Sequence, residues 1–261
     1  MNKENKEYLY GYYPVYLALS KNTGNRGLYR LFINKNKKNN ARLESLIRWG
    51  RKKNVEILKL DKKDFNNYFE KNFDLIDKFS NQGVVLEVSS YNYYYLDKYL
   101  SREIRKDSRL AILDGVTDVG NFGSIIRNCS AFSFDGILIS KDRSVPVNKR
   151  VSKISAGALE NVRIFRVTNL VRNMKKLKEA GFWVYGTASE NNGNIQDLGE
   201  AEFTFPLAIV FGSEGRGLSR LVEENCDFMV RVEMGKNIQS LNISVASGII
   251  MHRVYMEKKN G

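Results

Sequence analysis

The chain has 261 residues, of which 43% are hydrophobic and 27% are charged, and its 42 Lys and Arg outnumber its 29 Asp and Glu to give a formal net charge of +13. This balance is typical of globular proteins and excludes an intrinsically disordered chain. The chain has one histidine, His252, which excludes a Ser–His–Asp triad of the usual form and a multi-histidine zinc site. It has two cysteines, Cys129 and Cys226, which are too few for a disulfide framework. We therefore expect reduced thiols and no bound metal.

The first third of the chain alternates between helical and strand patterns. Pro14 opens a short predicted helix that runs to Leu19, because proline is well tolerated in a first helical turn. Apolar residues at helical spacing predict a second helix over Ala41–Arg51. Apolar runs predict strands at Leu28–Ile33, Val55–Leu58 and Gly83–Val88. Residues 1–90 are therefore predicted to form a small α/β domain.

A tyrosine-rich and then charged stretch follows and is the predicted linker, residues 91–108. Its aromatic side chains fit two explanations: a surface that stacks RNA bases, or packing where two domains meet. We favour packing.

From Arg109 to residue 261 the alternation becomes more regular. Apolar runs predict strands at Leu110–Leu113, Gly136–Ile139, Phe182–Gly186 and Leu207–Phe211. Helical spacing predicts helices at Phe122–Phe132, Asn169–Ala180 and Leu241–Glu257. Strands that alternate with helices predict a mostly parallel sheet covered on both faces, so residues 109–261 are predicted to form a second α/β domain.

Positive charge is concentrated in two segments. Residues 1–53 hold 13 Lys and Arg against 3 Asp and Glu, and residues 141–178 hold 11 against 2. A solvated surface would explain this surplus, and so would two basic faces for a polyanion, whose phosphates Lys and Arg neutralise. The charge therefore suggests a nucleic-acid partner but indicates no reaction.

The sequence contains no signal for a membrane or for export. The apolar runs are short and interrupted by charges, so no membrane association is expected. Residues 1–8 (MNKENKEY) have no apolar core and carry two glutamates, which disfavours a secretory signal and a mitochondrial presequence. We expect a cytoplasmic protein, and a mitochondrial or other organellar location stays open if a presequence has been removed.

The first segment that carries chemistry is Leu110–Phe132 (LAILDGVTDVGNFGSIIRNCSAF). A strand leads into a loop and then a helix, and Asn121 and Arg127 lie six residues apart near the strand end, where open α/β sheets bind ligands. A helix-capping asparagine and a surface arginine would explain the same two residues.

The second segment is Ile209–Ser219 (IVFGSEGRGLS). Its glycines allow tight turns and close approach of a ligand to the backbone. No Lys-Ser/Thr pair follows them, and their order is G-x-x-G-x-G, so neither a P-loop nor a dinucleotide fingerprint is present. Glu214 stands out, because a charged residue among glycines at a strand end is rarely needed for folding.

The third segment is Val232–Gly248 (VEMGKNIQSLNISVASG). The small polar residues Ser240, Asn242 and Ser244 alternate with apolar ones as a helix begins. Capping of that helix would explain a serine or asparagine there.

In this order and spacing, the three segments closely resemble the SpoU family of RNA ribose 2′-O-methyltransferases, in the SPOUT superfamily. The resemblance rests on Asn121-x-Gly123 with Arg127, on Gly212-x-Glu214-x-x-Gly217-Leu218-Ser219, and on Ser240-Leu241-Asn242-x-Ser244-Val245-Ala246. Tyr10-Gly11 and Asn81-Gln82-Gly83-Val84 are similar to the family's substrate-binding domain. Residues 141–144 (KDRS) and 155–160 (SAGALE) most resemble the branch that methylates a guanosine of large-subunit ribosomal RNA.

The resemblance implies a deep trefoil knot in the C-terminal α/β domain, S-adenosylmethionine as the cofactor, RNA as the partner and a homodimer that needs no metal. It places the cofactor against main chain at Gly212, around Val232 and at Leu241. Glycine at 212 suits this role, because a side chain would obstruct a ligand that rests on the backbone.

The resemblance also implies the catalytic residues. Arg127 matches the family arginine proposed as general base, but a guanidinium with a pKa above about 12 stays protonated, so we favour a grip on phosphate and stabilisation of charge on the 2′-oxygen. Asn121 and Ser240 would orient Arg127 or the ribose, and Glu214 would position Arg127 or its own loop. Asn242 would support the geometry of cofactor and ribose.

Two positions depart from the family pattern. Val119 and Glu233 stand where the family favours proline, which removes backbone restraint from two loops. No proposed catalytic position is changed.

Two alternatives to a ribosomal RNA methyltransferase stay open: a transfer-RNA 2′-O-methyltransferase, and a noncatalytic RNA-binding ribosome-assembly factor that keeps the fold as a scaffold. The intact catalytic positions favour an enzyme, and the separate N-terminal domain favours ribosomal RNA.

Overall fold

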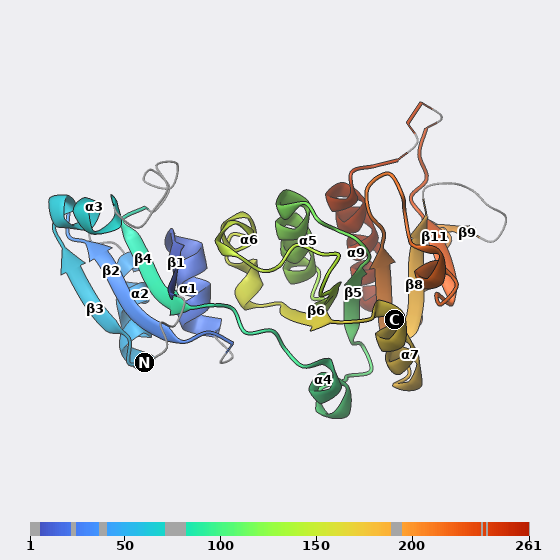
Figure 1. The fold of residues 1–261 in the computed structure, drawn as a ribbon, viewed down its shortest axis with the longest axis horizontal. Helices are drawn as coiled ribbons and strands as arrows, with labels where there is room; N and C mark the ends of the chain where they lie inside the picture. Colours follow the sequence, from blue (N-terminus) through green and yellow to red (C-terminus); the bar gives the residue numbers. More distant parts are fainter. Residues whose placement is uncertain are drawn as a thin grey trace. The chain divides into compact units, whose positions relative to one another are not determined.

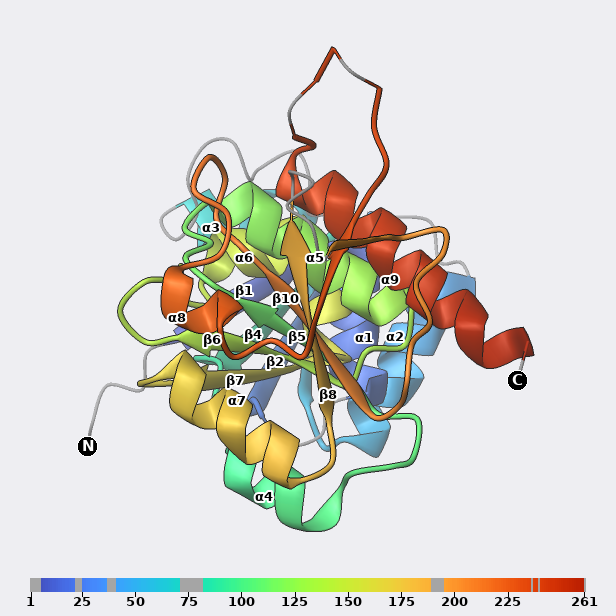
Figure 2. The ribbon, with the colours of Figure 1, turned by 90° about the vertical axis from the view of Figure 1, so that its right-hand side faces the viewer.

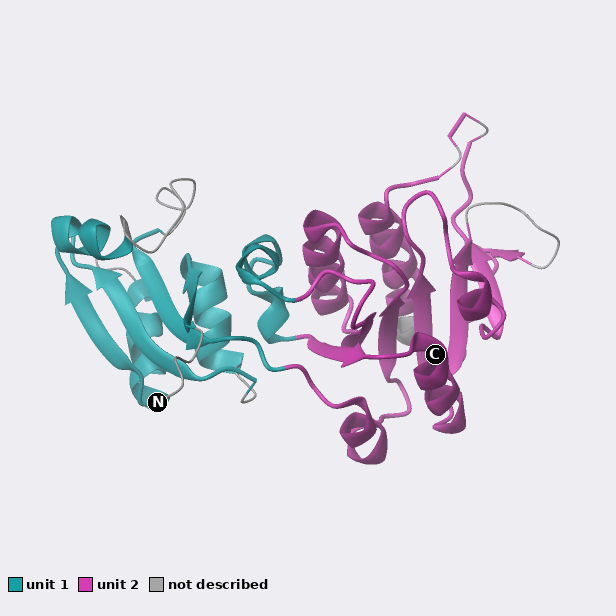
Figure 3. Cartoon of the chain, in the orientation of Figure 1, with its two compact units in different colours: residues 1–92, 147–161 teal, residues 93–146, 162–261 magenta. Residues whose placement is uncertain are grey.

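The computed structural model describes residues 6–21, 25–36, 41–70, 82–188, 195–235, 237–238 and 240–260. The chain divides into two compact units, one of residues 1–92 and 147–161 and the other of residues 93–146 and 162–261 (Figure 3). Residues 147–161 fall within the predicted second domain, 109–261, but in the structure they belong to unit 1. Of the family-like residues quoted above, Asn81 lies outside the described residues.

Unit 1 contains a four-stranded sheet in the order β1-β4-β2-β3 (Figure 1). Strand β4 (Val84–Ser89) runs antiparallel to β1 (Lys6–Tyr10) and β2 (Leu28–Asn34), whereas β2 and β3 (Glu56–Leu60) are parallel. Among the described residues, the helices of this unit's N-terminal segment are α1 (Tyr12–Lys21), α2 (Ala41–Lys52) and α3 (Lys62–Glu70).

Alternation along β2 explains why this sheet is covered on both faces. Leu31 and Ile33 pack in one cluster with the buried residues of α1 and α2, whereas Phe32 packs with Phe65 and Phe69 of α3. Successive side chains of a strand point to opposite faces, so one apolar run serves two cores. Strand β1 and helix α3 were not predicted, and the other elements lie within a few residues of their predicted limits.

The returning segment 147–161 forms α6 (Lys149–Ile154) and a short 3₁₀ helix at Ala158–Glu160. It packs closely on α1: Gly157 has a φ of +88°, and a Cβ there would lie 2.8 Å from the Cα of Pro14. Only glycine fits this position without strain.

Buried charges also hold the returning segment in unit 1. The fully buried guanidinium of Arg26 lies 2.6 Å from Glu7 Oε2 and 3.3 Å from Glu160 Oε1, and it donates to Ser152 Oγ at 3.1 Å. Burial raises the pKa of Glu160 above its ordinary value, and the positive charge of Arg26 opposes this shift. Removing one partner of such a cluster would leave a buried charge without compensation.

Unit 2 contains a seven-stranded sheet in the order β7-β6-β5-β10-β8-β11-β9, and its strand pairs are all parallel. The strands are β5 (Arg109–Leu113), β6 (Gly136–Ser140), β7 (Arg163–Val167), β8 (Trp183–Ala188), β9 (Ile195–Asp197), β10 (Leu207–Phe211) and β11 (Phe228–Arg231). Strands β5 and β10 are buried along their whole length, as expected for the centre of a parallel sheet.

Helices cover both faces of this sheet (Figure 2). On one face, α4 (Leu96–Arg102) and α7 (Leu170–Glu179) pack against alternate residues of the central strands. On the other face lie α5 (Val119–Ala131) and α9 (Ile243–Asn260), and α8 (Arg220–Glu223) follows the second motif. The predicted mostly parallel α/β fold with a smaller N-terminal α/β domain is confirmed.

The stretch predicted as a linker contributes to packing. Helix α4 lies within it, and Tyr99 of that helix is buried in the core of unit 2. Tyr91 is buried in unit 1, whereas 80% of the Tyr95 surface is exposed. Packing therefore explains Tyr91 and Tyr99 but not Tyr95.

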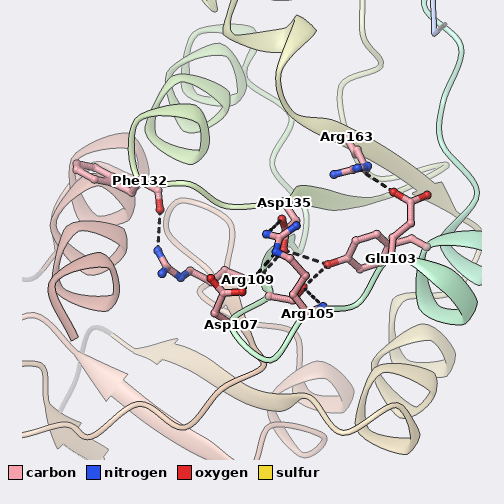
Figure 4. Close-up of polar contacts among 9 residues, drawn as sticks. Glu103, Arg105, Asp107, Arg109, Phe132, Asp135 and Arg163 are labelled. Carbon is pink, nitrogen blue, oxygen red and sulfur yellow. Dashed lines mark hydrogen bonds and ion pairs between the residues drawn. The ribbon is translucent and has the colours of Figure 1, made fainter. Parts of the chain in front are cut away.

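A network around Asp135 fastens the segment after α4 to the amino end of the sheet (Figure 4). The Asp135 carboxylate accepts from Tyr99 Oη at 3.1 Å, from the Arg109 backbone N–H at 3.1 Å and from Arg105 Nη2 at 2.5 Å. The buried Arg109 side chain donates to the Phe132 carbonyl at 3.1 Å. These contacts lie at the amino ends of the strands, whereas the loops of the three motifs follow the carboxyl ends. We therefore infer that the contacts stabilise the fold and take no part in the site.

Candidate functional site

The loops of the first two motifs begin at the same edge of the sheet of unit 2. Strands β5 and β10 are parallel neighbours, and the first two motifs follow their carboxyl ends. Asp114, the first residue after β5, ties the two loops together: its backbone N–H donates to the Phe211 carbonyl at 2.9 Å, and its Oδ2 accepts from the Ser219 N–H at 2.7 Å. The sequence analysis missed Asp114, although its position directly after a buried strand was a usable signal.

Three side chains, one from each motif, form an amide–carboxylate cluster of Asn121, Glu214 and Asn242. Glu214 Oε1 accepts from Asn121 Nδ2 at 3.1 Å and from Asn242 Nδ2 at 2.6 Å. Asn242 Nδ2 also donates to Asn121 Oδ1 at 3.1 Å. The structure thus brings together three of the five predicted catalytic residues.

Local structure explains how the two asparagines are placed. Asp118 caps α5 by accepting from the Asn121 N–H at 2.7 Å, so Asn121 is not the cap and its side chain is left for the cluster. Asn242 caps a helix and also belongs to the cluster. Its Oδ1 accepts from the Ser244 N–H at 2.9 Å at the start of α9, and its Nδ2 donates to Glu214. Helix capping therefore does not explain Asn121. It explains the carbonyl oxygen of the Asn242 side chain but not its NH₂ group.

The glycine loop of the second motif folds back on itself. The backbones of Ser213 and Gly217 exchange two hydrogen bonds of 3.0 Å, and Gly215 and Gly217 have φ values of +80° and +65°. A Cβ on Gly212 would lie 2.2 Å from the carbonyl carbon of Gly217. The need for glycine at 212 is therefore explained by the chain's own turn, whereas we had expected it from the approach of a ligand.

A cavity of about 600 Å³ opens beside this loop within unit 2. Its volume is within the range of about 300–1,000 Å³ that small-molecule sites occupy. All three predicted cofactor-binding residues line it, together with three of the predicted catalytic residues: Gly212, Val232, Leu241, Glu214, Ser240 and Asn242. The amide–carboxylate cluster therefore adjoins the cavity through Glu214 and Asn242.

The cavity walls combine apolar and charged groups. Leu218, Ile243 and Ile250 are among the apolar residues. Glu214 and Glu223 are acidic, and among the described lining residues Arg216 is the only cation. Neither Glu223 nor Arg216 was singled out from the sequence, because the spacing of the motif gives no information about which side chains face the cavity.

Two predicted catalytic residues lie apart from the cluster. Arg127 is exposed on α5 and does not line the cavity, and its side chain makes no hydrogen bond or ion pair with the described part of the chain. Six residues correspond to about 600° of helical rotation, so Arg127 points about 120° away from Asn121 around α5. Ser240 lines the cavity and makes no hydrogen bond to the cluster.

The helices that carry the motifs are clamped to each other next to Arg127. Asn128 Nδ2 donates to the Ser244 carbonyl and to Ser247 Oγ, both at 2.9 Å. This contact fixes α5 against the first turn of α9, so the first and third motifs have one relative position.

The departures from the family pattern have little structural consequence at Val119. This residue is the first of α5, directly after the Asp118 cap, which is the position where a helix tolerates proline. The helix begins there with valine as well. Glu233 is an exposed residue of the loop that follows β11.

Within the described ranges, no group of three or more His, Cys, Asp and Glu side chains is arranged to hold a metal ion. In the same part of the chain, no helix has the length and apolar character to span a bilayer.

Two family models match the sequence. Residues 108–252 match the SpoU rRNA Methylase family, and residues 8–94 match the model described as RNA 2′-O ribose methyltransferase substrate binding. A relative from Staphylococcus aureus (strain MSSA476), provisionally named a TrmH family tRNA/rRNA methyltransferase, is 41% identical over 187 residues, which are 71% of this chain and 74% of the relative.

Solved structures share the fold. The SpoU methyltransferase AviRb from Streptomyces viridochromogenes, in complex with AdoMet, matches with a TM-score of 0.74 and 22% identity over 98% of this chain and 91% of that chain. The AdoMet-bound rRNA methyltransferase from Sinorhizobium meliloti matches with a TM-score of 0.72 and 19% identity over 96% and 87% of the two chains.

Proposed function

The chain belongs to the SpoU rRNA methylase family and is an S-adenosylmethionine-dependent RNA 2′-O-ribose methyltransferase, and we propose that its substrate is a guanosine of large-subunit ribosomal RNA. The observation that carries the proposed mechanism is the amide–carboxylate cluster beside the cavity. Residues from three distant segments converge there on a single carboxylate oxygen.

The cavity fits the cofactor. Its backbone wall at Gly212 and its apolar residues Val232 and Leu241 suit an adenosine group, and Arg216 and Glu223 carry charges opposite to the carboxylate and the ammonium of the methionine group. When bound, the cofactor supplies a methyl group that its sulfonium already activates. The chain therefore needs to align the ribose oxygen and to stabilise the charge that develops on it.

We assign alignment to the amide–carboxylate cluster. Because Glu214 holds both amides, Asn121 and Asn242 are fixed before substrate arrives, and a preorganised polar group costs no reorganisation during the reaction. Ser240, on the cavity wall, would donate to or accept from the ribose. The 2′-oxygen would bond to the methyl carbon as the sulfonium–methyl bond breaks to leave a neutral thioether, and its proton would pass to solvent water.

We assign charge stabilisation to Arg127. Its guanidinium offers a planar set of N–H donors and, within the described residues, is not engaged by a carboxylate, so it is available to an RNA phosphate or to the developing oxyanion. The role of general base does not suit this group.

The choice of ribosomal RNA is supported by the separate N-terminal unit, most of which matches the substrate-binding model, and by the positive surplus of residues 1–53. The resemblance of residues 141–144 and 155–160 to the branch that acts on large-subunit RNA supports guanosine. A homodimer, a trefoil knot around the cavity and a cytoplasmic location complete the proposal.

Mapping of 2′-O-methyl groups tests this proposal. Ribosomal and transfer RNA from cells with and without the protein are compared, and we expect one guanosine of large-subunit RNA to lose its methyl group. Loss at a transfer-RNA position instead would overturn the substrate and leave the reaction standing. If purified protein transferred no methyl group to either RNA, the reaction itself would be wrong.

A further inference from the structure

Helix α1 of unit 1 presents three tyrosines side by side. The rings of Tyr12 and Tyr16 are stacked, with centroids 5.6 Å apart and an interplanar angle of 17°. The Tyr13 ring meets that of Tyr12 edge to face at 5.2 Å, and 57% of the Tyr13 surface is exposed. At positions i, i+1 and i+4 the three residues span an arc of about 100°. We call Tyr12, Tyr13 and Tyr16 the tyrosine face.

The core of unit 1 does not need the exposed ring. The buried residues of α1 are Val15, Ala18 and Leu19, which are fully covered and lie about 120–160° around the helix from Tyr13. Tyr12 and Tyr16 pack at the edge of that core, but Tyr13 is absent from it. Packing therefore accounts for two rings and leaves the third unexplained.

Cations border the tyrosine face. The guanidinium carbon of Arg42, at the start of α2, lies 5.3 Å from the centroid of the Tyr12 ring. Helix α2 (ARLESLIRWGRK) carries four Arg and Lys and one acidic residue, Glu44. A guanidinium that stacks on a ring keeps its N–H groups available at the edge of its plane, where a phosphate binds.

The helix start also holds the tyrosine face in a fixed orientation. Gly11, with a φ of +88°, precedes α1, and Gln82 Oε1 accepts from the Tyr12 N–H at 3.0 Å. Gln82 is one of the residues that resemble the family's substrate-binding domain, and its structural task is to cap α1. A rigid aromatic group loses little entropy when a flat ligand stacks on it.

We propose that the tyrosine face stacks an unpaired nucleobase of the RNA substrate while Arg42 contacts the adjoining phosphate. Exposed rings beside cations are the chemistry by which proteins bind splayed-out bases of RNA loops and bulges. A paired base keeps both faces within the duplex, so the surface selects single-stranded RNA. This inference rests on the proposed function, because it takes RNA as the substrate.

The test compares Tyr13→Ala and Tyr13→Phe with the matched control Tyr95→Ala, which removes a more exposed tyrosine from unit 2. Binding of a labelled RNA stem-loop and of a fully paired RNA of the same length is measured by fluorescence anisotropy at one salt concentration. We expect Tyr13→Ala to weaken stem-loop binding by about tenfold and to leave duplex binding unchanged. Tyr13→Phe and Tyr95→Ala should bind as wild type.

Salt dependence separates stacking from charge. Arg42→Gln should lower the slope of log K against log salt by about 1, because one phosphate contact is lost, whereas Tyr13→Ala should leave the slope unchanged. Thermal unfolding of each variant shows that the fold is kept.

Three results would overturn the inference. Tyr13→Ala could bind the stem-loop with wild-type affinity, or it could lose the same affinity for stem-loop and duplex. The third result is that Tyr95→Ala alone loses affinity for the stem-loop. Methyl transfer by the wild-type protein is measured in parallel. If transfer occurs and Tyr13→Ala binds normally, the tyrosine face is not used and the proposed function stands. If no RNA is methylated, the proposed function fails and the anisotropy data still report on the face.

Discussion

Asn242 Nδ2 donates to Asn121 Oδ1 at 3.1 Å, although the two residues are 121 positions apart in the sequence. Glu214 accepts from both amides, so the three motifs meet at one carboxylate. Hydrogen bonds to a charged acceptor are shorter and stronger than those between neutral groups, so the shared carboxylate favours one orientation of both amides.

Glu214→Ala should lower single-turnover methyl transfer by about 10²-fold, because both amides lose the acceptor that orients them. The matched control is Glu224→Ala, which removes an exposed carboxylate paired with Arg220 and should have wild-type activity. Wild-type single-turnover rates for Glu214→Ala would show that the cluster does not align the substrate.

Arg127→Ala should remove nearly all methyl transfer, by about 10²–10³-fold, and leave cofactor affinity unchanged, because Arg127 does not line the cavity. Arg127→Lys should restore little activity, since an ammonium lacks the planar fork of a guanidinium. Single-turnover methylation and cofactor calorimetry measure the two effects, with Arg172→Ala on α7 as the control. A parallel loss of cofactor binding would contradict the role assigned to Arg127.

Gly212→Ala should abolish cofactor binding, because the new Cβ would collide with the Gly217 backbone and force the loop open. Gly235→Ala is the control: no atom of the described residues lies within 4 Å of its added Cβ, and its φ is not positive. Calorimetry with S-adenosylmethionine gives the affinities. Equal affinities for both variants would mean that the loop does not form the cofactor wall.

The free energy of unfolding should fall as the pH rises above about 9. Burial raises the pKa of the Cys129 thiol and of the Tyr99 hydroxyl, and it raises the pKa of Cys226 to about 12. The folded protein then keeps protons that the unfolded chain releases, and stability falls with pH wherever the folded state binds more protons.

Urea unfolding at pH 7.5, 9 and 10 measures this dependence, and Cys226→Ser should reduce it by removing one of the groups. A free energy of unfolding that stays constant or rises over this range would contradict the assignment of these groups as buried and protonated.

The sequence predicted the centre of the fold better than its edges. Strands β5 and β10 appear as uninterrupted apolar runs because both of their faces are buried. Strand β1 (KEYLY) and strand β7 (RIFRV) lie at sheet edges and mix charged with apolar residues, so no run marks them. Helix α3 (KKDFNNYFE) has nine residues and buries Phe65 and Phe69, so few apolar residues mark it in the sequence.

At the site, the sequence identified which residues matter but not how they interact. The order of the motifs indicated that Asn121, Glu214 and Asn242 belong to one site. The bonds between them depend on side-chain rotamers and on the rotation of α5 about its axis, which also separates Arg127 from Asn121. The reason for glycine at 212 lies in the fold of its own loop, and no local pattern indicates that contact.

The return of residues 147–161 to unit 1 determines when that unit can finish folding on the ribosome. Arg26 is made early, but Glu160, which it meets at 3.3 Å, is translated only after two strands and two helices of unit 2. Until then the Arg26 side chain lacks its carboxylate partner Glu160, and α1 lacks the segment that packs on Pro14. The N-terminal unit therefore cannot complete its core first, as leading domains commonly do during synthesis. Likewise, a fragment that begins near Arg109 would carry Glu160 without the positive charge of Arg26. We therefore expect neither unit to be stable as a separate fragment cut at that position.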